Sequence, residues 1–210
     1  GCRGRSIASR SAPRSLKNTN LALYDVATRT AREVSSKAFD NSVGAMRFSA
    51  DGATILFNAQ ERVYGSMFAF DIASGRVTPL TKETMVRAPS FSADGRTAAF
   101  AMDTPTSPAE VYVSDDRFSN PLRLTTTNPQ LASISMGETE VVTWKSSDGW
   151  SVEGVLLKPV GYRPGQKVPL LVDVHGGPTG AHTNGFKASW GNAGQFWAGQ
   201  GWAVLYPNPR

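Results

Sequence analysis

A five-residue motif occurs twice in the first half of the chain, and its spacing constrains the fold more than any other feature. Phe48–Gly52 reads Phe-Ser-Ala-Asp-Gly and recurs 43 residues later as Phe91–Gly95. Asp-Gly is a typical hairpin turn, because glycine tolerates the positive φ that such turns need. A period of roughly 40–45 residues is that of a four-stranded propeller blade. The repeat therefore predicts successive antiparallel four-stranded units.

Two further markers recur in step with this motif. A strand-like segment ends in Asp three times, at Leu21–Asp25, Met67–Asp71 and Val111–Asp115. Each is followed about ten residues later by a short closing segment: Glu33–Ser35, Pro79–Thr81 and Arg123–Thr125. Residues 21–125 are thus predicted to form a partial β-propeller of two to three blades, whereas a closed propeller needs roughly 4–8. Asp51 and Asp94 are interpreted as turn residues rather than catalytic carboxylates, since each occupies the same place in its repeat.

The repeat stops after Thr125, and residues 126–138 read as a linker. Val141–Trp144 and Val152–Leu157 then flank Ser147-Asp148-Gly149, which predicts an antiparallel hairpin. Leu170–Val174 is an apolar run with few polar interruptions, as expected of a strand covered on both faces.

A crossover and a second buried strand, Trp202–Tyr206, are expected next. Four apolar residues at helical spacing predict a helix packed on the core, and three glycines weaken it. The apolar set is Phe186, Trp190, Ala193 and Trp197, and the glycines are Gly191, Gly194 and Gly199. Gly201 fits the helix stop. A hairpin followed by strand, helix and strand indicates the beginning of a parallel sheet.

Four segments in this order resemble the prolyl oligopeptidase family, chiefly its acylaminoacyl-peptidase and dipeptidyl-peptidase branches. They are Trp144–Gly149, Val168–Leu170, His175–Pro178 and Gly201–Arg210. The resemblance covers about residues 20–210 and implies propeller blades followed by the N-terminal part of an α/β-hydrolase domain, residues 139–210. In that family the propeller restricts access to short or unstructured peptides, which are hydrolysed through an acyl-enzyme.

The resemblance also implies that this chain is a fragment of such a serine peptidase. No Gly-x-Ser-x-Gly nucleophile elbow occurs in the sequence, and neither Ser66 nor Ser189 lies in such a context. No catalytic residue is therefore assigned within the chain. The nucleophilic Ser, the Asp and the His are expected beyond Arg210, so the 210 residues alone should not hydrolyse peptides.

The glycine turn after the apolar strand is the one part of the active site that the sequence presents. Gly176 and Gly177 lack Cβ atoms, so their N–H groups can approach a substrate carbonyl closely. By the resemblance, this turn contributes to the oxyanion hole. Pro178 has no N–H, and which of the two glycines donates stays open. His175 is interpreted as a structural anchor, because the base of an α/β-hydrolase follows the nucleophile and the acid along the chain.

The remaining polar candidates are given structural roles. His182 is interpreted as a loop residue, and Asp173 as the donor or acceptor of a structural hydrogen bond. His175 and His182 make a poor zinc site, since no carboxylate is spaced as a partner ligand. No metal and no cofactor is predicted.

A net charge of +5 suggests a nucleic-acid partner, but the position of the excess basic residues along the chain argues against one. The whole excess lies in residues 1–20, a Ser/Arg-rich head expected to be a solvated tail or a frayed edge. The head carries Arg3, Arg5, Arg10, Arg14 and Lys17. Residues 21–210 hold 17 basic and 17 acidic residues and show no basic face interleaved with aromatics, so no nucleic-acid partner is predicted.

The single cysteine, Cys2, allows no internal disulfide. No run approaches the ~20 apolar residues of a membrane span. Neither the compartment nor the oligomeric state can be predicted from these features.

Two other functions are compatible with parts of the sequence. A TolB-like propeller that binds a partner without catalysis would need a third Phe-Ser-x-Asp-Gly near residue 134, where the chain instead has Ile134–Glu138. An esterase of the same hydrolase fold would lack the propeller-like repeat. Both alternatives therefore rank below the peptidase.

Overall fold

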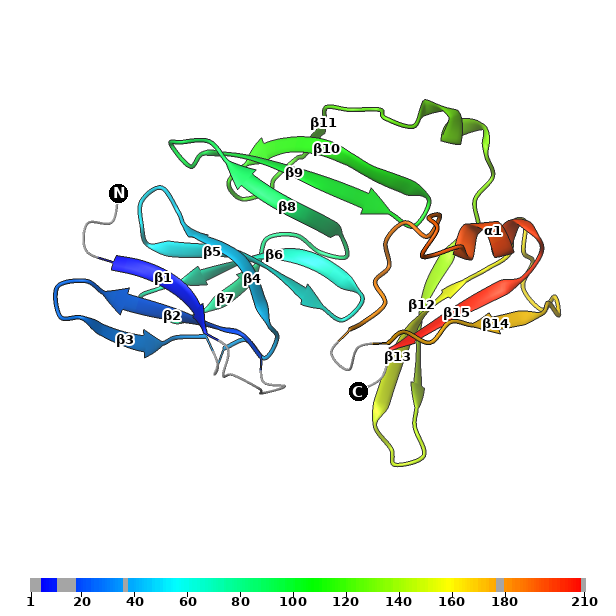
Figure 1. Cartoon of the computed structure of the whole chain (residues 1–210), viewed down its shortest axis with the longest axis horizontal. Helices are drawn as coiled ribbons and strands as arrows, with labels where there is room; N and C mark the ends of the chain where they lie inside the picture. Colours follow the sequence, from blue (N-terminus) through cyan, green and yellow to red (C-terminus); the bar gives the residue numbers. More distant parts are fainter. Residues whose placement is uncertain (1–4, 11–17, 36–37, 177–179, 209–210) are drawn as a thin grey trace. The chain divides into compact units, whose positions relative to one another are not determined.

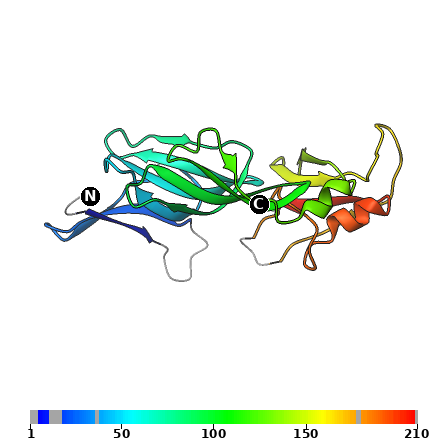
Figure 2. The ribbon, with the colours of Figure 1, turned by 90° about the horizontal axis from the view of Figure 1, so that it is seen from above.

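The computed structural model describes residues 5–10, 18–35, 38–176 and 180–208, and it consists mostly of β-strands (Figures 1 and 2). The chain forms two compact units. The first comprises Gly1–Glu61, Gly65–Met102 and Val111–Thr125. The second comprises Arg62–Tyr64, Asp103–Glu110 and Thr126–Arg210. Within the described residues, no helix is long and apolar enough to cross a membrane.

The first unit begins with a three-stranded antiparallel sheet of order β1-β2-β3. Its strands are β1 (Arg5–Arg10), β2 (Asn20–Asp25) and β3 (Thr30–Glu33). β1 comes from the basic head, which therefore contains a paired strand rather than being only a solvated tail. Without β1, the N–H and C=O groups along one edge of β2 would be unpaired. β1 pairs with this edge at every residue from Asn20 to Asp25.

An eight-stranded sheet follows and contains the two copies of the sequence repeat. The first copy is β4 (Val43–Phe48), β5 (Thr54–Glu61), β6 (Tyr64–Asp71) and β7 (Val77–Pro79). The second is β8 (Met85–Phe91), β9 (Thr97–Thr104), β10 (Ser107–Asp115) and β11 (Leu122–Arg123). The order is β11-β10-β9-β8-β6-β5-β4, with β7 paired to β6. One parallel bridge, Gly65 to Met85, joins the two copies.

The repeated Asp-Gly motifs form the same turn. The Ser49 hydroxyl donates to the Asp51 carboxylate at 2.6 Å, and the Ser92 hydroxyl donates to Asp94 at 2.5 Å. Gly52 and Gly95 have φ of 72° and 75°. These serine bonds, followed by backbone N–H bonds, hold the pKa of Asp51 and of Asp94 below its ordinary value. Both carboxylates are thus engaged in turns, as the repeat predicts.

The closing segments repeat at the level of single hydrogen bonds. Ser35 Oγ, Thr81 Oγ1 and Thr125 Oγ1 each accept the N–H of the first residue of the preceding strand-like segment. The three donors are Leu21, Met67 and Val111, at 2.8, 3.0 and 2.9 Å. The final hydroxyl of each closing segment is therefore a structural part of the repeat.

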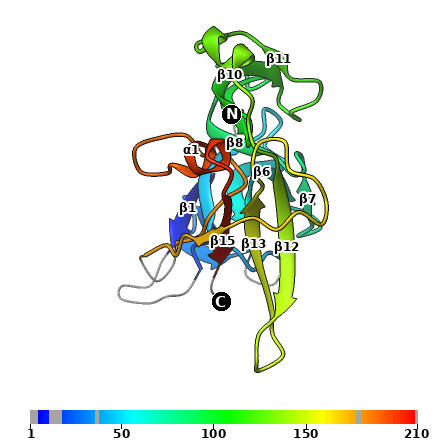
Figure 3. The same cartoon turned by 90° about the vertical axis from the view of Figure 1, so that its right-hand side faces the viewer.

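The second unit is built on a four-stranded sheet of order β12-β13-β15-β14. Its elements are the 3₁₀ helix η1 (Pro129–Ser133), β12 (Thr139–Lys145), β13 (Ser151–Leu157), β14 (Leu170–Val172), α1 (Gly194–Gly199) and β15 (Ala203–Asn208). The strands β12, β13 and β15 are antiparallel neighbours, whereas β14 runs parallel to β15. Figure 3 shows β12, β13 and β15 side by side. The predicted hairpin and the predicted second strand are both present.

The core of this unit lies between the sheet and α1. Its buried members are Val63, Val155, Leu157, Ala198, Val204 and Tyr206. Segment 126–138, expected to be a linker, contains η1 and then joins β12.

The predicted crossover helix is much shorter than expected. α1 begins only at Gly194, and Trp190 is fully exposed at 106% rather than packed in the core. Glycine is a poor helix former, and Gly191 interrupts the apolar stripe, so helical spacing alone does not build the first turns. The predicted stop is confirmed, because Gly201 has φ of 84° just after the helix.

The apolar run at 170–174 also differs from expectation. β14 is an edge strand of the sheet and covers only Leu170–Val172. Leu170, Val172 and Val174 are 52%, 51% and 74% exposed. Residues two apart in a strand share one face, so the face that carries these three side chains is not covered by any described part of the chain.

Candidate functional site

The segment that leaves β14 carries the predicted oxyanion turn. The Asp173 N–H donates to the Leu205 carbonyl at 2.9 Å and so extends the pairing with β15 by one residue. His175 Nδ1 lies 3.1 Å from the Gly176 carbonyl oxygen. Gly176 is exposed, and a Cβ built on it would meet no described atom within 4 Å. Gly177 and Pro178 lie outside the described residues.

His182 joins this segment from the loop that follows it. Its Nε2 donates to the Asp173 carbonyl at 3.0 Å. The His182 ring centroid lies 5.0 Å from that of His175 and 4.9 Å from that of Tyr206, edge to face in both cases. The two histidines are therefore neighbours, and Asp173 takes part in a structural hydrogen bond through its backbone carbonyl.

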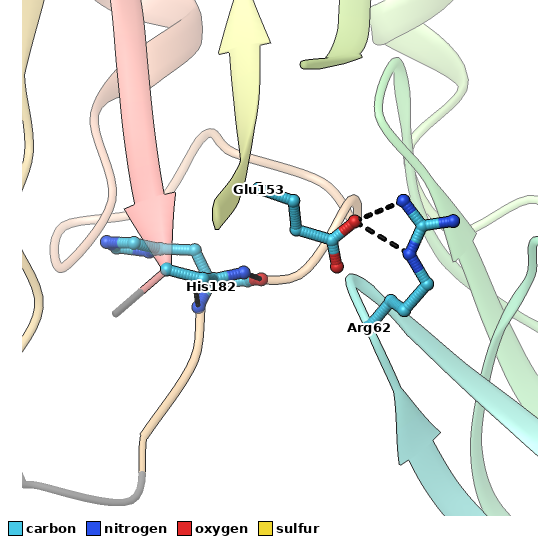
Figure 4. Close-up of polar contacts among 4 residues, drawn as sticks. Arg62, Glu153 and His182 are labelled. Atoms are coloured by element: carbon cyan, nitrogen blue, oxygen red, sulfur yellow. Dashed lines mark hydrogen bonds and ion pairs between the residues drawn. The ribbon is translucent and has the colours of Figure 1, made fainter. Parts of the chain in front are cut away.

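Asn208, at the end of β15, fixes the backbone of His182. Its Oδ1 accepts the His182 N–H at 2.6 Å, and its Nδ2 donates to the His182 carbonyl at 2.9 Å. Figure 4 shows His182 at this position. The side chains of Asn208 and His182 together thus link the end of β15 to the segment that follows β14. Asn208 is not among the residues predicted for the site, because no local motif in the sequence signals this link.

Burial and a neighbouring cation set the electrostatics of this cluster. Lys187 is 3% exposed, and its Nζ lies 4.4 Å from the centre of the Tyr206 ring. Burial, followed by the nearby Asp173 carboxylate, raises the pKa of the Tyr206 hydroxyl, which donates to Asn192 at 2.8 Å. Burial, followed by the charge of Lys187, lowers the pKa of His182. His182 is therefore neutral in the folded chain at neutral pH.

The lowered pKa of His182 predicts that the chain loses stability in mild acid. The ordinary pKa of histidine is 6.5, so below that pH the unfolded chain binds a proton that the folded chain resists. The free energy of unfolding should therefore decrease as the pH falls from about 7.5 to about 5. Urea unfolding at several pH values should show this decrease, and His182→Gln should flatten it. An equal decrease in the variant would contradict the assignment to His182.

A pocket of about 570 Å³ lies beside Asn208 in the second unit. It is lined by Arg62, Thr143, Ser151, Val152, Glu153, Ala181 and Asn208. Nε of Arg62 donates to Glu153 Oε2 at 2.8 Å, and Nη2 lies 2.5 Å from the same oxygen (Figure 4). The Glu153 side chain is 15% exposed, whereas that of Arg62 is 61% exposed. The two residues are 91 positions apart, so no spacing in the sequence signals the pair.

Ser66 and Ser189 are not in a catalytic arrangement in the described structure. Ser66 is buried in β6 of the first unit, and Ser189 lies in an exposed loop of the second. Neither hydroxyl has a hydrogen bond to either histidine, both of which are described. Within the described ranges, no three His, Cys, Asp or Glu residues group as a metal site.

Comparison with known proteins gives peptidases in both sequence and fold. No protein-family model matches the chain. Dipeptidyl-peptidase 5 of Arthroderma otae is 24% identical over 187 residues, which cover 81% of this chain and 24% of that protein. A probable dipeptidyl-peptidase 5 of Trichophyton verrucosum is 23% identical over 189 residues, with the same coverage. The chain thus spans about a quarter of the length of these curated relatives.

Solved structures extend the likeness to almost the whole chain. Pyrococcus horikoshii acylaminoacyl peptidase matches 99% of this chain with 31% of its own length, at a TM-score of 0.76 and 21% identity. Porphyromonas gingivalis dipeptidyl peptidase 4 matches 99% with 29% of its length, at 0.72 and 18%. In sequence the chain is thus similar to dipeptidyl peptidases, and in fold it is similar to part of acylaminoacyl and dipeptidyl peptidases.

Proposed function

We propose that the chain is part of a serine peptidase in which a partial β-propeller, residues 21–125, precedes the start of an α/β-hydrolase domain, residues 139–210. The observation that carries this proposal is the parallel pair β14–β15, with the exposed Gly176 four residues beyond the end of β14. Ligand sites of parallel sheets lie at the carboxyl ends of the strands. The similarity to peptidases along most of the chain supports the same assignment.

The proposed reaction is the hydrolysis of short peptides through an acyl-enzyme. A serine oxygen attacks the peptide carbonyl carbon, and a histidine takes the serine proton and passes it to the leaving amine. Water then attacks the ester carbon, and the serine regains its proton. The N–H of Gly176 or Gly177 would donate to the carbonyl oxygen while that oxygen carries negative charge. His175 would anchor the turn, and the nucleophile, acid and base would follow Arg210.

The direct test compares this chain with the product of the coding region extended beyond Arg210. We expect a fluorophosphonate probe to label the extended protein and leave the 210-residue chain unlabelled. Hydrolysis of Ala-Ala-p-nitroanilide against acetyl-Ala-p-nitroanilide would then separate a dipeptidyl peptidase from an acylaminoacyl peptidase. An extended protein that is folded but neither labelled nor active on either substrate would refute the proposal.

Gly176→Ala should separate catalysis from stability. A methyl group here would meet no described atom of the protein but would crowd a substrate carbonyl. We expect kcat/KM of the extended protein to fall about 10²-fold, the order of a lost oxyanion donor. The melting temperature of the 210-residue chain should stay within about 1 °C of the original, because surface changes usually cost little. Unchanged kcat/KM would exclude a role for Gly176 next to the reacting carbonyl.

A further inference from the structure

We propose that His182 is a positioning residue that holds the segment after β14, from Asp173 to Gly176, in place. The inference rests on the proposed function only for the catalytic purpose of Gly176. The structural link itself stands on contacts within the second unit.

The segment has few other attachments among the described residues. The Asp173 N–H pairs with Leu205, but Val174, His175 and Gly176 make no backbone–backbone hydrogen bond there. Apart from the Asp173 N–H bond, the segment has two further hydrogen bonds among the described residues. They run from His182 Nε2 to the Asp173 carbonyl and, locally, between His175 Nδ1 and the Gly176 carbonyl. With the Asp173 N–H bond to Leu205, the bond from His182 is one of the two described hydrogen bonds that join this segment to residues outside it.

His182 is itself well held, so it can serve as a support. Asn208 bonds both the N–H and the carbonyl of His182, and Asn208 belongs to β15. The His182 ring rests against Tyr206, which is 1% exposed and belongs to the same strand. β15 lies in the sheet between β13 and β14. The support therefore begins in an inner strand, β15, and ends at Asp173 in the segment after β14.

The ring of His182 also contacts His175 directly. Their centroids are 5.0 Å apart in an edge-to-face arrangement. The charged and titratable groups around His182 are Lys187, Asp173, His175 and Tyr206. The Nε2–H donor is present both in the neutral tautomer that bonds Asp173 and in the protonated ring, so the positioning role requires no change of charge.

The test compares two replacements of His182 in the 210-residue chain. His182→Phe keeps a ring between His175 and Tyr206 but lacks the donor. His182→Gln loses the ring but retains an N–H donor of similar reach. NMR hydrogen exchange at the Asp173 amide, with ¹⁵N relaxation at Gly176, reports the order of the segment. His182→Phe removes the bond to the Asp173 carbonyl, so local opening of the segment should become easier by about the free energy of one hydrogen bond. We therefore expect hydrogen exchange at the Asp173 amide to rise about tenfold. His182→Gln should restore most of the protection.

Asn192→Ala is the matched control, because it removes a 2.8 Å bond to Tyr206 on the other side of the same cluster. It should destabilise the unit without raising exchange at Asp173 beyond the change in global stability. If His182→Phe raises Asp173 exchange no more than this control does, the positioning role is wrong. Should His182→Phe fail to fold, Asn208→Asp gives the same decision, since it keeps the acceptor for the His182 N–H and removes the amide donor.

These readouts need no enzymatic activity, so the two proposals fail separately. Protection at Asp173 that is independent of His182, in a chain whose extended form hydrolyses peptides, would overturn the positioning role alone. A confirmed link in a chain whose extended form takes no probe would overturn the peptidase alone.

Discussion

Phe57→Ala should lower the free energy of unfolding of the first unit by about 3–5 kcal/mol, the usual cost of deleting a buried aromatic ring. Phe57 lies on β5 and has no exposed surface. Its ring stacks on Phe68 at 5.4 Å between centroids and meets the edge of Phe39 at 5.3 Å. Removing the ring would leave a cavity between two aromatic neighbours that belong to other segments and cannot collapse easily.

The measurement is urea unfolding followed by far-UV circular dichroism, because the first unit contains no tryptophan. Phe57→Leu keeps an apolar side chain and should cost less than about 1.5 kcal/mol. Val26→Ala, at a side chain that is 52% exposed, should stay within about 0.5 kcal/mol of the original. A loss below about 1 kcal/mol for Phe57→Ala would mean that the aromatic cluster does not stabilise this unit.

The repeat offers an internal check. Phe100 occupies the place of Phe57 one period later and is 3% exposed. It packs against Phe118 at 5.1 Å and stacks on Tyr112 at 6.0 Å, in a separate cluster. Phe100→Ala should therefore have a loss of the same size.

What the sequence could predict is what depends on neighbours along the chain. Asp51 and Asp94 bond serines two residues away, and the glycine of each turn has the positive φ that its position demands. The closing hydroxyls bond a strand only 14 residues earlier. Because these interactions are local and repeated, a periodic sequence reveals them.

The parts that could not be predicted depend on several distant segments at once. The support of the turn needs Asp173, His182 and Asn208 together, and no spacing connects them. The ion pair of Arg62 with Glu153 likewise joins residues far apart in the sequence. The prediction for Trp190 is wrong for the opposite reason, because it relied on local spacing alone. Its helical spacing predicts burial, but the helix begins only at Gly194, after the first of the nearby glycines, and Trp190 is exposed.

Gly137 is the clearest case of a residue whose role emerges only from packing. It falls in the segment that reads as a linker, yet both of its backbone groups bond the side chain of Gln195. The Gly137 N–H donates to Gln195 Oε1 at 2.8 Å, and its carbonyl accepts from Nε2 at 3.0 Å. Gln195 is 7% exposed, and its Nε2 also donates to the Pro105 carbonyl at 3.1 Å. A buried amide whose three bonds are all made fixes the segment in one place.

Gly137→Ala should therefore lower the free energy of unfolding of the second unit by about 3 kcal/mol, at the upper end of the usual cost of overpacking. Its Cβ would lie 2.3 Å from the Lys158 carbonyl oxygen and 2.9 Å from the Ala198 Cβ, so backbone must shift. That shift would also loosen the bonds to Gln195, which adds to the cost.

All five tryptophans lie in the second unit, so urea unfolding followed by tryptophan fluorescence measures this change. Gly199→Ala is the control, because a Cβ at Gly199 meets no described atom within 4 Å and its φ is not positive. That variant should be neutral or gain up to about 1 kcal/mol, since alanine restricts the unfolded chain. If Gly137→Ala were as stable as Gly199→Ala, segment 126–138 would be the loose linker that its composition suggests, and Gln195 would not hold it to the sheet and α1.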